Sequence, residues 1–262
     1  MALNGIFEDG KLLLLAYDHG MEHGPSDFEE HPASADPETI FRLAGSEYVT
    51  GLAVQKGVAE KYYSDYSEDV NLVLKLNGVT SLREGKPYSA LNCSVDYAEE
   101  IGADAVGYTI YPGSEREGEM FETFGMVQER ARELGLPVLL WSYPRGGKVE
   151  DDTDPKIVKY AARLGLELGA DVAKVKHPGS GEAAEEAVRA AGKTDLVLSG
   201  GAKSGDLEFL EDVGTVMDAG FKGIAVGRNV WQRENPREYL EAVGKVVFDG
   251  EKPKKALEEV GT

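Results

Sequence analysis

The chain has 262 residues, of which 42% are hydrophobic, so it is long enough to bury a large core in one or two domains. Its 47 acidic and 28 basic residues give a formal net charge of −19, which argues against a nucleic-acid partner and an anionic membrane surface, since both bind clustered cations. The acidic residues are spread along the whole chain, which favours a halophilic source, because such a surface keeps a protein soluble in high salt.

Short apolar runs with few charges recur along the chain, and each ends in a polar or glycine-rich turn. Such runs are typical of strands that are buried on both faces of a parallel sheet. We expect eight of these strands, at residues 12–17, 49–55, 71–76, 105–111, 137–143, 172–176, 195–199 and 223–227.

Helix-like segments lie between the apolar runs. Ser34 or Asp36, Ser94 and Asp154 precede three of them as plausible N-caps, and Gly135 follows another as a stop. The repeated order of helix, glycine and strand is typical of alternating β/α units. We expect helices at residues 37–43, 95–101, 119–134, 155–168, 182–191 and 206–218, and a polar, peripheral tail at residues 250–262.

The pattern predicts an α/β fold, a single-domain (β/α)8 TIM barrel over residues 1–262. No G-x-G-x-x-G follows an early strand, so an open doubly wound sheet lacks its motif. In a TIM barrel the catalytic residues lie at the C-terminal ends of the strands, and these ends are almost all polar here.

The sixth run carries Lys174 and Lys176, two residues apart, so their side chains point to the same face of a strand. Inside a barrel, a desolvated lysine beside a second cation has a lowered pKa and becomes a nucleophilic amine, the chemistry of a Schiff base. Residue chemistry does not choose between the two lysines, and one of them could instead pair with a carboxylate such as Asp18.

The last two strand ends predict a phosphate site. Glycines after the seventh strand let backbone N–H groups approach an anion, and an arginine after the eighth strand opens a short helix. Phosphate sites in this fold are often built from these two loops, although each could be only a tight turn. The residues are Ser199, Gly200 and Gly201 in one loop and Gly227 and Arg228 in the other.

Two further strand ends supply candidate proton-transfer groups. Trp141 and Tyr143 share a face, and a phenol beside cations can move protons, although core packing is the alternative. Asp18 follows the first strand and could instead form an Asx-turn or a helix cap. Lys75, at the end of the third strand, is expected to line the barrel without a catalytic part.

No metal site is expected. His19 and His23 have a spacing that suits a helix, but Gly20, Gly24 and Pro25 make a helix unlikely there. The single cysteine, Cys93, excludes an intrachain disulfide and fits a reducing cytoplasm. The first residues do not read as a signal peptide, and no apolar run is long enough to span a membrane.

Taken in order, these motifs resemble the archaeal-type class I fructose-1,6-bisphosphate aldolases of the DeoC/FbaB group, along almost the whole chain. The segments that carry the resemblance are residues 16–25, 75–78, 92–94, 107–114, 141–147, 174–176, 199–201 and 226–229.

The resemblance implies roles that the residues alone leave open. It assigns the Schiff base to Lys174, proton transfer to Tyr143 and assistance to Asp18, and it places the sugar C1-phosphate at the two glycine turns. Trp141 belongs to the same motif as Tyr143. Lys176 is then the neighbouring charge that lowers the pKa of Lys174 or steers phosphate. The family uses no metal or other cofactor and forms homo-oligomers.

The resemblance also leaves an alternative substrate. Archaeal 2-amino-3,7-dideoxy-D-threo-hept-6-ulosonate synthases share the lysine and the phosphate turns. The chain departs from the common aldolase pattern at His177, Pro178 and Ala202, next to the expected phosphate contacts. A metal-dependent aldolase that uses His19 and His23, and a sugar-phosphate-binding protein without activity, are the remaining hypotheses.

Overall fold

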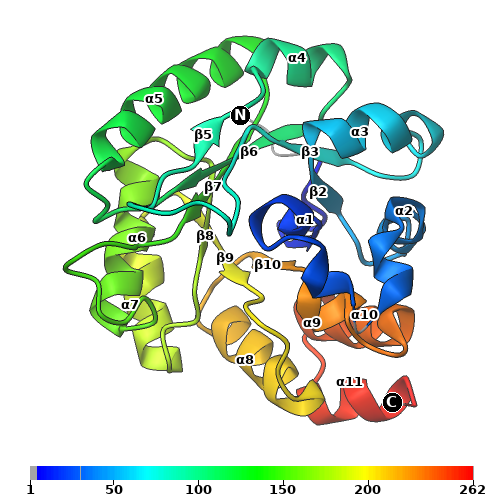
Figure 1. Cartoon of the computed structure of the whole chain (residues 1–262). Helices are drawn as coiled ribbons and strands as arrows, with labels where there is room; N and C mark the ends of the chain where they lie inside the picture. Colours follow the sequence, from blue (N-terminus) through cyan, green and yellow to red (C-terminus); the bar gives the residue numbers. More distant parts are fainter. Residues whose placement is uncertain (1–4, 30, 262) are drawn as a thin grey trace.

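The computed structural model describes residues 5–29 and 31–261 and contains a closed barrel of parallel strands (Figure 1). Around the barrel the strands follow the order β1-β10-β9-β8-β7-β6-β3-β2, so each strand pairs with its neighbour in the chain once the small β4-β5 hairpin is set aside. The predicted (β/α)8 barrel is confirmed.

The eight predicted strands all form, with ends within two residues of those expected. They are β1 (Leu12–Ala16), β2 (Gly51–Gln55), β3 (Leu72–Lys75), β6 (Ala105–Ile110), β7 (Val138–Ser142), β8 (Val172–Val175), β9 (Asp195–Ser199) and β10 (Gly223–Val226).

The six predicted helices also form, because their end signals are local. Asp36, Ser94 and Asp154 each accept a hydrogen bond from a backbone N–H of the first turn, so Asp36 and not Ser34 is the cap. Gly135 ends its helix in the left-handed conformation at φ 78°. The helices are α2 (Pro37–Ala44), α4 (Val95–Glu100), α5 (Glu117–Leu134), α6 (Pro155–Glu167), α7 (Gly181–Ala191) and α8 (Asp206–Asp218).

Several elements were not expected from the sequence. The prediction against a helix around His19 is wrong, because α1 forms one turn there in spite of the nearby glycines. The tail is less peripheral than expected, since its helix α11 packs against α8 and buries Ala256. The additional elements are α1 (His19–Glu22), η1 (Pro25–Phe28), η2 (Pro32–Ala35), α3 (Lys56–Tyr62), η3 (Tyr63–Asp65), β4 (Asn77–Gly78), β5 (Ala90–Leu91), α9 (Arg228–Trp231), α10 (Pro236–Gly244), η4 (Lys245–Asp249) and α11 (Pro253–Glu259).

The core has two layers. The larger layer lies between the strands and the outer helices, and the smaller one fills the barrel interior. Ile6, from the segment before β1, is fully buried in the interior layer. The C-terminal end of β1 leads to α1, which lies at the middle of the barrel in Figure 1. None of the helices within residues 5–29 and 31–261 is long and apolar enough to cross a membrane.

Candidate active site

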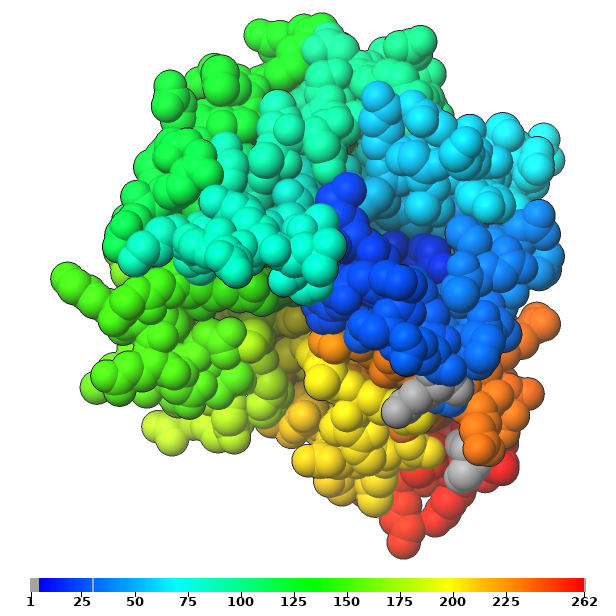
Figure 2. Space-filling view, viewed as in Figure 1, coloured from blue at the N-terminus to red at the C-terminus, as the bar shows by residue number. Residues whose placement is uncertain are grey.

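A cavity of about 280 Å³ lies at the C-terminal ends of the strands, and Figure 2 shows the surface hollowed between the blue, green and yellow parts of the chain. All of the site residues predicted from the sequence line this cavity. They are Asp18, Trp141, Tyr143, Lys174, Lys176, Ser199, Gly200, Gly201, Gly227 and Arg228.

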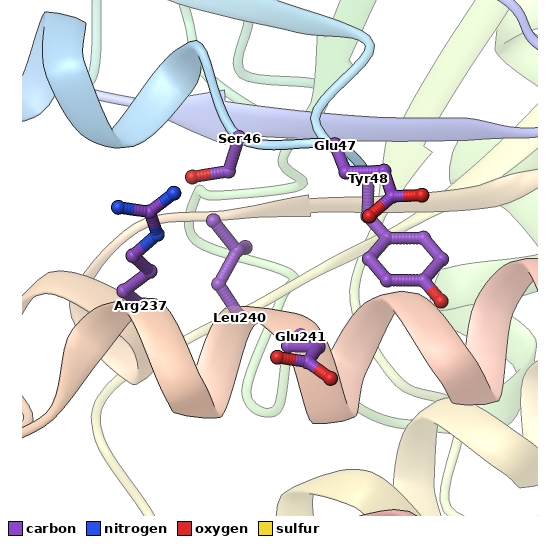
Figure 3. Close-up of a pocket in the computed structure, with 6 residues that line it drawn as sticks. All are labelled: Ser46, Glu47, Tyr48, Arg237, Leu240 and Glu241. Carbon is purple, nitrogen blue, oxygen red and sulfur yellow. The ribbon is translucent and has the colours of Figure 1, made fainter. Parts of the chain in front are cut away.

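A second hollow, shown in Figure 3, lies between the segment before β2 and helix α10. It is smaller, about 110 Å³, and the residues that line it include Glu47, Arg237 and Glu241 but no lysine, histidine or cysteine. It opens near the N-terminal end of β2, the end of this fold that does not carry catalytic groups. The cavity at the C-terminal ends is therefore the candidate active site.

Lys174 lies in β8, where it neighbours Trp141 of β7 in register, and is only 6% exposed. Its amine lies 5.2 Å from the centre of a Trp141 ring. Burial lowers the pKa of Lys174 to about 8; Asp18 opposes this shift, and Lys75 adds to it by repulsion. The amine of Lys174 is therefore partly neutral, and nucleophilic, near neutral pH.

Lys176 lines the same cavity, and its amine pairs with a carboxylate. It follows the last residue of β8 and places Nζ 2.5 Å from Oδ2 of Asp152, in the loop after β7. Repulsion by Lys75 and by Arg228 adds to the lowering of the Lys174 pKa that burial causes. A pKa-lowering role for Lys176 stays a prediction.

Lys75 is the functional residue that sequence reasoning underestimated. It lies at the end of β3, is fully buried, and places Nζ 3.1 Å from Asp18 Oδ2 and 3.4 Å from Glu22 Oε1. It also lies 5.0 Å from the centre of a Trp141 ring, so both lysines are close to the same indole. The signal that could have found it was the one used for Lys174, a lysine inside a short apolar run.

The charges of Lys75 and Asp18 are fixed by their pairing. Burial alone would lower the pKa of Lys75, but Glu22 and Asp18 together hold it above the usual value. Burial would likewise raise the pKa of Asp18, but attraction to Lys75 and to neighbouring groups holds it well below its usual range. Asp18 is thus a carboxylate. Although it precedes α1, its side chain forms no capping hydrogen bond to that helix, so its role is the ion pair with Lys75 and not that of a cap.

Tyr143 faces the cavity, and its hydroxyl lies 3.0 Å from the Ser199 hydroxyl. Burial raises the pKa of Tyr143 far above that of free tyrosine, so the phenol keeps its proton. A protonated phenol at this place can donate to a developing alkoxide or carbanion. Ser199 therefore contacts the proton-transfer candidate as well as belonging to the predicted phosphate site.

The glycine loop after β9 is fixed in position by hydrogen bonds from Asn229, which is fully buried. The Asn229 side-chain amide donates to the carbonyl oxygens of Gly200 and Ala202, at 2.6 and 2.7 Å. One expectation is corrected here: the Gly200 N–H donates to Ala225 O at 3.1 Å within the barrel, so it does not face an anion. Gly201, at φ +66°, turns the chain into the cavity after it.

Arg228 opens the short helix α9 on the other side of the predicted phosphate site. Its Nη1 lies 3.8 Å from Asp27 Oδ2, and its buried Nε has no hydrogen-bond partner within the described residues. Gly227 before it must be a glycine, because a Cβ would lie 2.5 Å from the His19 ring. An unpaired guanidinium N–H beside a glycine turn is suited to an oxyanion.

His19 and His23 do not form a metal site with a third ligand: within residues 5–29 and 31–261, no three His, Cys, Asp or Glu side chains gather closely enough to hold an ion. Burial lowers the pKa of His19 to about 4, so its imidazole is neutral at pH 7. His23 places Nδ1 2.8 Å from Asp27 Oδ2.

A neighbouring hollow of about 250 Å³ adjoins the candidate active site and shares Glu22, His23 and Arg145 with it. The segment between β4 and β5 supplies Arg83 and Lys86 to this hollow. The two hollows meet at these three shared side chains, and basic side chains line both of them.

Residues 12–233 match the model of the DeoC/LacD family aldolases. The chain belongs to this family. It is 56% identical, over 91% of this chain and 90% of the relative, to the fructose-bisphosphate aldolase class 1 of Halobacterium salinarum. The protein of the same name from Thermoproteus tenax is 52% identical over 89% of this chain and 88% of its own length.

The structural comparison agrees. A solved archaeal fructose-1,6-bisphosphate aldolase, with its catalytic lysine covalently bound to the carbinolamine intermediate of the substrate, superposes with a TM-score of 0.90 at 49% identity. The match covers 94% of this chain and 97% of that one.

Proposed function

We propose that this chain is a class I fructose-1,6-bisphosphate aldolase, a carbon–carbon lyase that works through a Schiff base on Lys174. The observation that carries the proposal is a buried lysine whose pKa is lowered to about 8, at the mouth of a barrel that also offers a phosphate end. The relatives named class 1 fructose-bisphosphate aldolase support the substrate.

In cleavage, the neutral amine of Lys174 adds to the C2 ketone of the open-chain sugar and gives a carbinolamine. Asp18, held as a carboxylate by Lys75 at 3.1 Å, assists proton transfer as water leaves and the iminium forms. The iminium then accepts the electron pair of the C3–C4 bond, and glyceraldehyde 3-phosphate departs. Protonation of the enamine at C3 and hydrolysis release dihydroxyacetone phosphate and the free lysine.

Tyr143 moves the proton at the C4 oxygen. In the condensation direction, its protonated phenol donates to the aldehyde oxygen as the C3–C4 bond forms. By microscopic reversibility, cleavage requires the phenoxide form of Tyr143 to take the proton of the C4 hydroxyl, and the high pKa of this phenol makes the phenoxide a strong base in that step. The hydroxyl of Ser199, 3.0 Å away, supports the phenol in both directions.

The two ends of the site suit the two phosphates. Gly201, Gly227 and Arg228 lie near Lys174 and fit the phosphate on C1. Arg83 and Lys86, in the adjoining hollow, fit the phosphate on C6. Lys176 steers phosphate toward the mouth.

We further propose that the enzyme needs no metal or other cofactor, acts in the cytoplasm as a homo-oligomer, and consists of one domain over residues 1–262. A Schiff base supplies the electron sink that a metal ion would otherwise supply. The heptulosonate-synthase reaction, the alternative left by the sequence, would use the same lysine, and no observation on this chain favours it.

Borohydride reduction in the presence of dihydroxyacetone phosphate tests the proposal. The reduced adduct should lie on the peptide that contains Lys174, and activity should be lost in proportion to labelling. The idea is refuted if the treated enzyme stays unmodified and active. Parallel assays of fructose bisphosphate cleavage and of heptulosonate formation separate the two reactions.

A further inference from the structure

Glu22 is a carboxylate that the proposed mechanism does not use. It lies at the end of α1, and its side chain, 18% exposed, lines both hollows of the site. Its Oε1 pairs with Lys75 at 3.4 Å, and within the described part of the chain no hydrogen bond to its Oε2 is formed. One oxygen of Glu22 is therefore available to a ligand.

The backbone that carries Glu22 is held in place. The preceding residue, Met21, lies against the β4-β5 hairpin, where a Cβ on Gly78 would come within 2.3 Å of the Met21 sulfur. Asn92 Nδ2 contacts the same sulfur at 3.7 Å. Because α1 sits on this hairpin, the carboxylate of Glu22 is positioned by packing as well as by its ion pair with Lys75.

The position of Glu22 along the substrate follows from the two hollows. The phosphate end at Arg228 and the amine of Lys174 lie in one hollow, and Arg83 and Lys86 lie in the other. Side chains shared by both hollows face the middle of an extended sugar, beyond the bond that is cleaved. Of the shared residues, only Glu22 is an acceptor without N–H donors, so it suits a hydroxyl and repels a phosphate.

We propose that Glu22 is a specificity-determining residue that accepts a hydrogen bond from the C5 hydroxyl of the sugar, the hydroxyl next to the carbonyl of the aldehyde product. This rests on the proposed function. The C4 oxygen exchanges its proton with Tyr143 in that mechanism, so the next hydroxyl toward Arg83 is the one left for Glu22. An aldehyde that lacks this hydroxyl leaves the carboxylate without its partner and reacts poorly.

Condensation with two acceptors tests the inference, with dihydroxyacetone phosphate as donor in both. D-glyceraldehyde 3-phosphate carries the hydroxyl, and 3-oxopropyl phosphate lacks it. Wild-type enzyme should prefer the first by about 10- to 100-fold in kcat/KM, the usual effect of a hydrogen bond to a charged group. E22Q should lose most of that preference by slowing the first reaction alone, while E29Q, which changes an exposed carboxylate of the same segment, should keep it.

Borohydride trapping of dihydroxyacetone phosphate on Lys174 separates the outcomes. In E22Q, trapping at pH 9 should stay at the wild-type rate, because the Lys174 amine is already mostly neutral there and the donor half does not reach Glu22. If E22Q lowered the trapping rate and the kcat/KM for both acceptors by the same factor, Glu22 would only support Lys75, and the inference would be wrong. Equal use of the two acceptors by wild-type enzyme would also overturn it, whether or not E22Q folds. Absence of trapping in the wild-type enzyme would instead refute the proposed function.

Discussion

Lys174 and Lys75 both lie close to Trp141 and are both buried, and yet they have opposite electrostatic environments. Lys75 has two carboxylates, Asp18 and Glu22, within 3.4 Å, so its charge is stabilised. Lys174 forms no ion pair within the described part of the chain, and burial lowers its pKa to about 8. Burial alone therefore does not make a lysine nucleophilic here; burial without a close carboxylate does.

The largest effect is expected for K174M. Schiff-base formation, borohydride trapping and cleavage should all be lost, because no other amine replaces Lys174. The same change should raise the free energy of unfolding at pH 7, since it removes a buried cation that has no close partner.

The sign follows from the pKa. The folded value of about 8 lies below the usual 10.5, so a protonated Lys174 favours the unfolded chain. The cost is fully present below pH 8, amounts to about 3 kcal/mol at most, and disappears as the pH rises toward 10.5. Denaturant unfolding of K174M and wild type at pH 7 and pH 10 measures it. If K174M did not raise the free energy of unfolding at pH 7, or raised it equally at pH 7 and pH 10, the result would contradict an unpaired Lys174.

K75M should act in the opposite direction. It leaves Asp18 and Glu22 facing each other without their cation, which should lower the free energy of unfolding by about 3–5 kcal/mol. Lys174 would lose a repelling cation and feel both carboxylates, so its pKa should rise above about 8.

The pH profile tests this coupling. For wild type, kcat/KM should rise with pH through an apparent pKa near 8, as the free amine of Lys174 forms. In K75M that rise should move to higher pH. A rise that stays in place in a folded K75M would show that Lys75 stabilises the mouth but does not tune the nucleophile.

The contrast between the two lysines also shows what the sequence could predict. Apolar runs, caps such as Ser94 and the stop at Gly135 are local signals, and they predicted the barrel strands and six helices. From the barrel alone, polar strand ends predicted the residues that line the cavity.

Contacts between distant residues could not be predicted in this way. Lys75 and Asp18 are 57 residues apart, and their pairing depends on barrel closure and on a turn of helix, α1, that the glycines argued against. The hydrogen bond from the Gly200 N–H to the Ala225 carbonyl depends on the register of β9 and β10. The direction of the Lys176 side chain depends on Asp152 in a different loop.

The smallest effect is expected for K176M, which is the matched control for both buried lysines. Lys176 is about one-third exposed and pairs with Asp152, so its loss should change the free energy of unfolding by no more than about 1 kcal/mol. The pH at which kcat/KM rises should stay that of wild type, because burial, Lys75 and Arg228 lower the pKa of Lys174 and the charge of Lys176 is paired with Asp152. If Lys176 steers phosphate, KM for fructose bisphosphate should increase and become more dependent on salt, with kcat unchanged. A rise displaced to higher pH in K176M would instead return the pKa-lowering role to this lysine, and the contrast between Lys174 and Lys75 would no longer explain the nucleophile by itself.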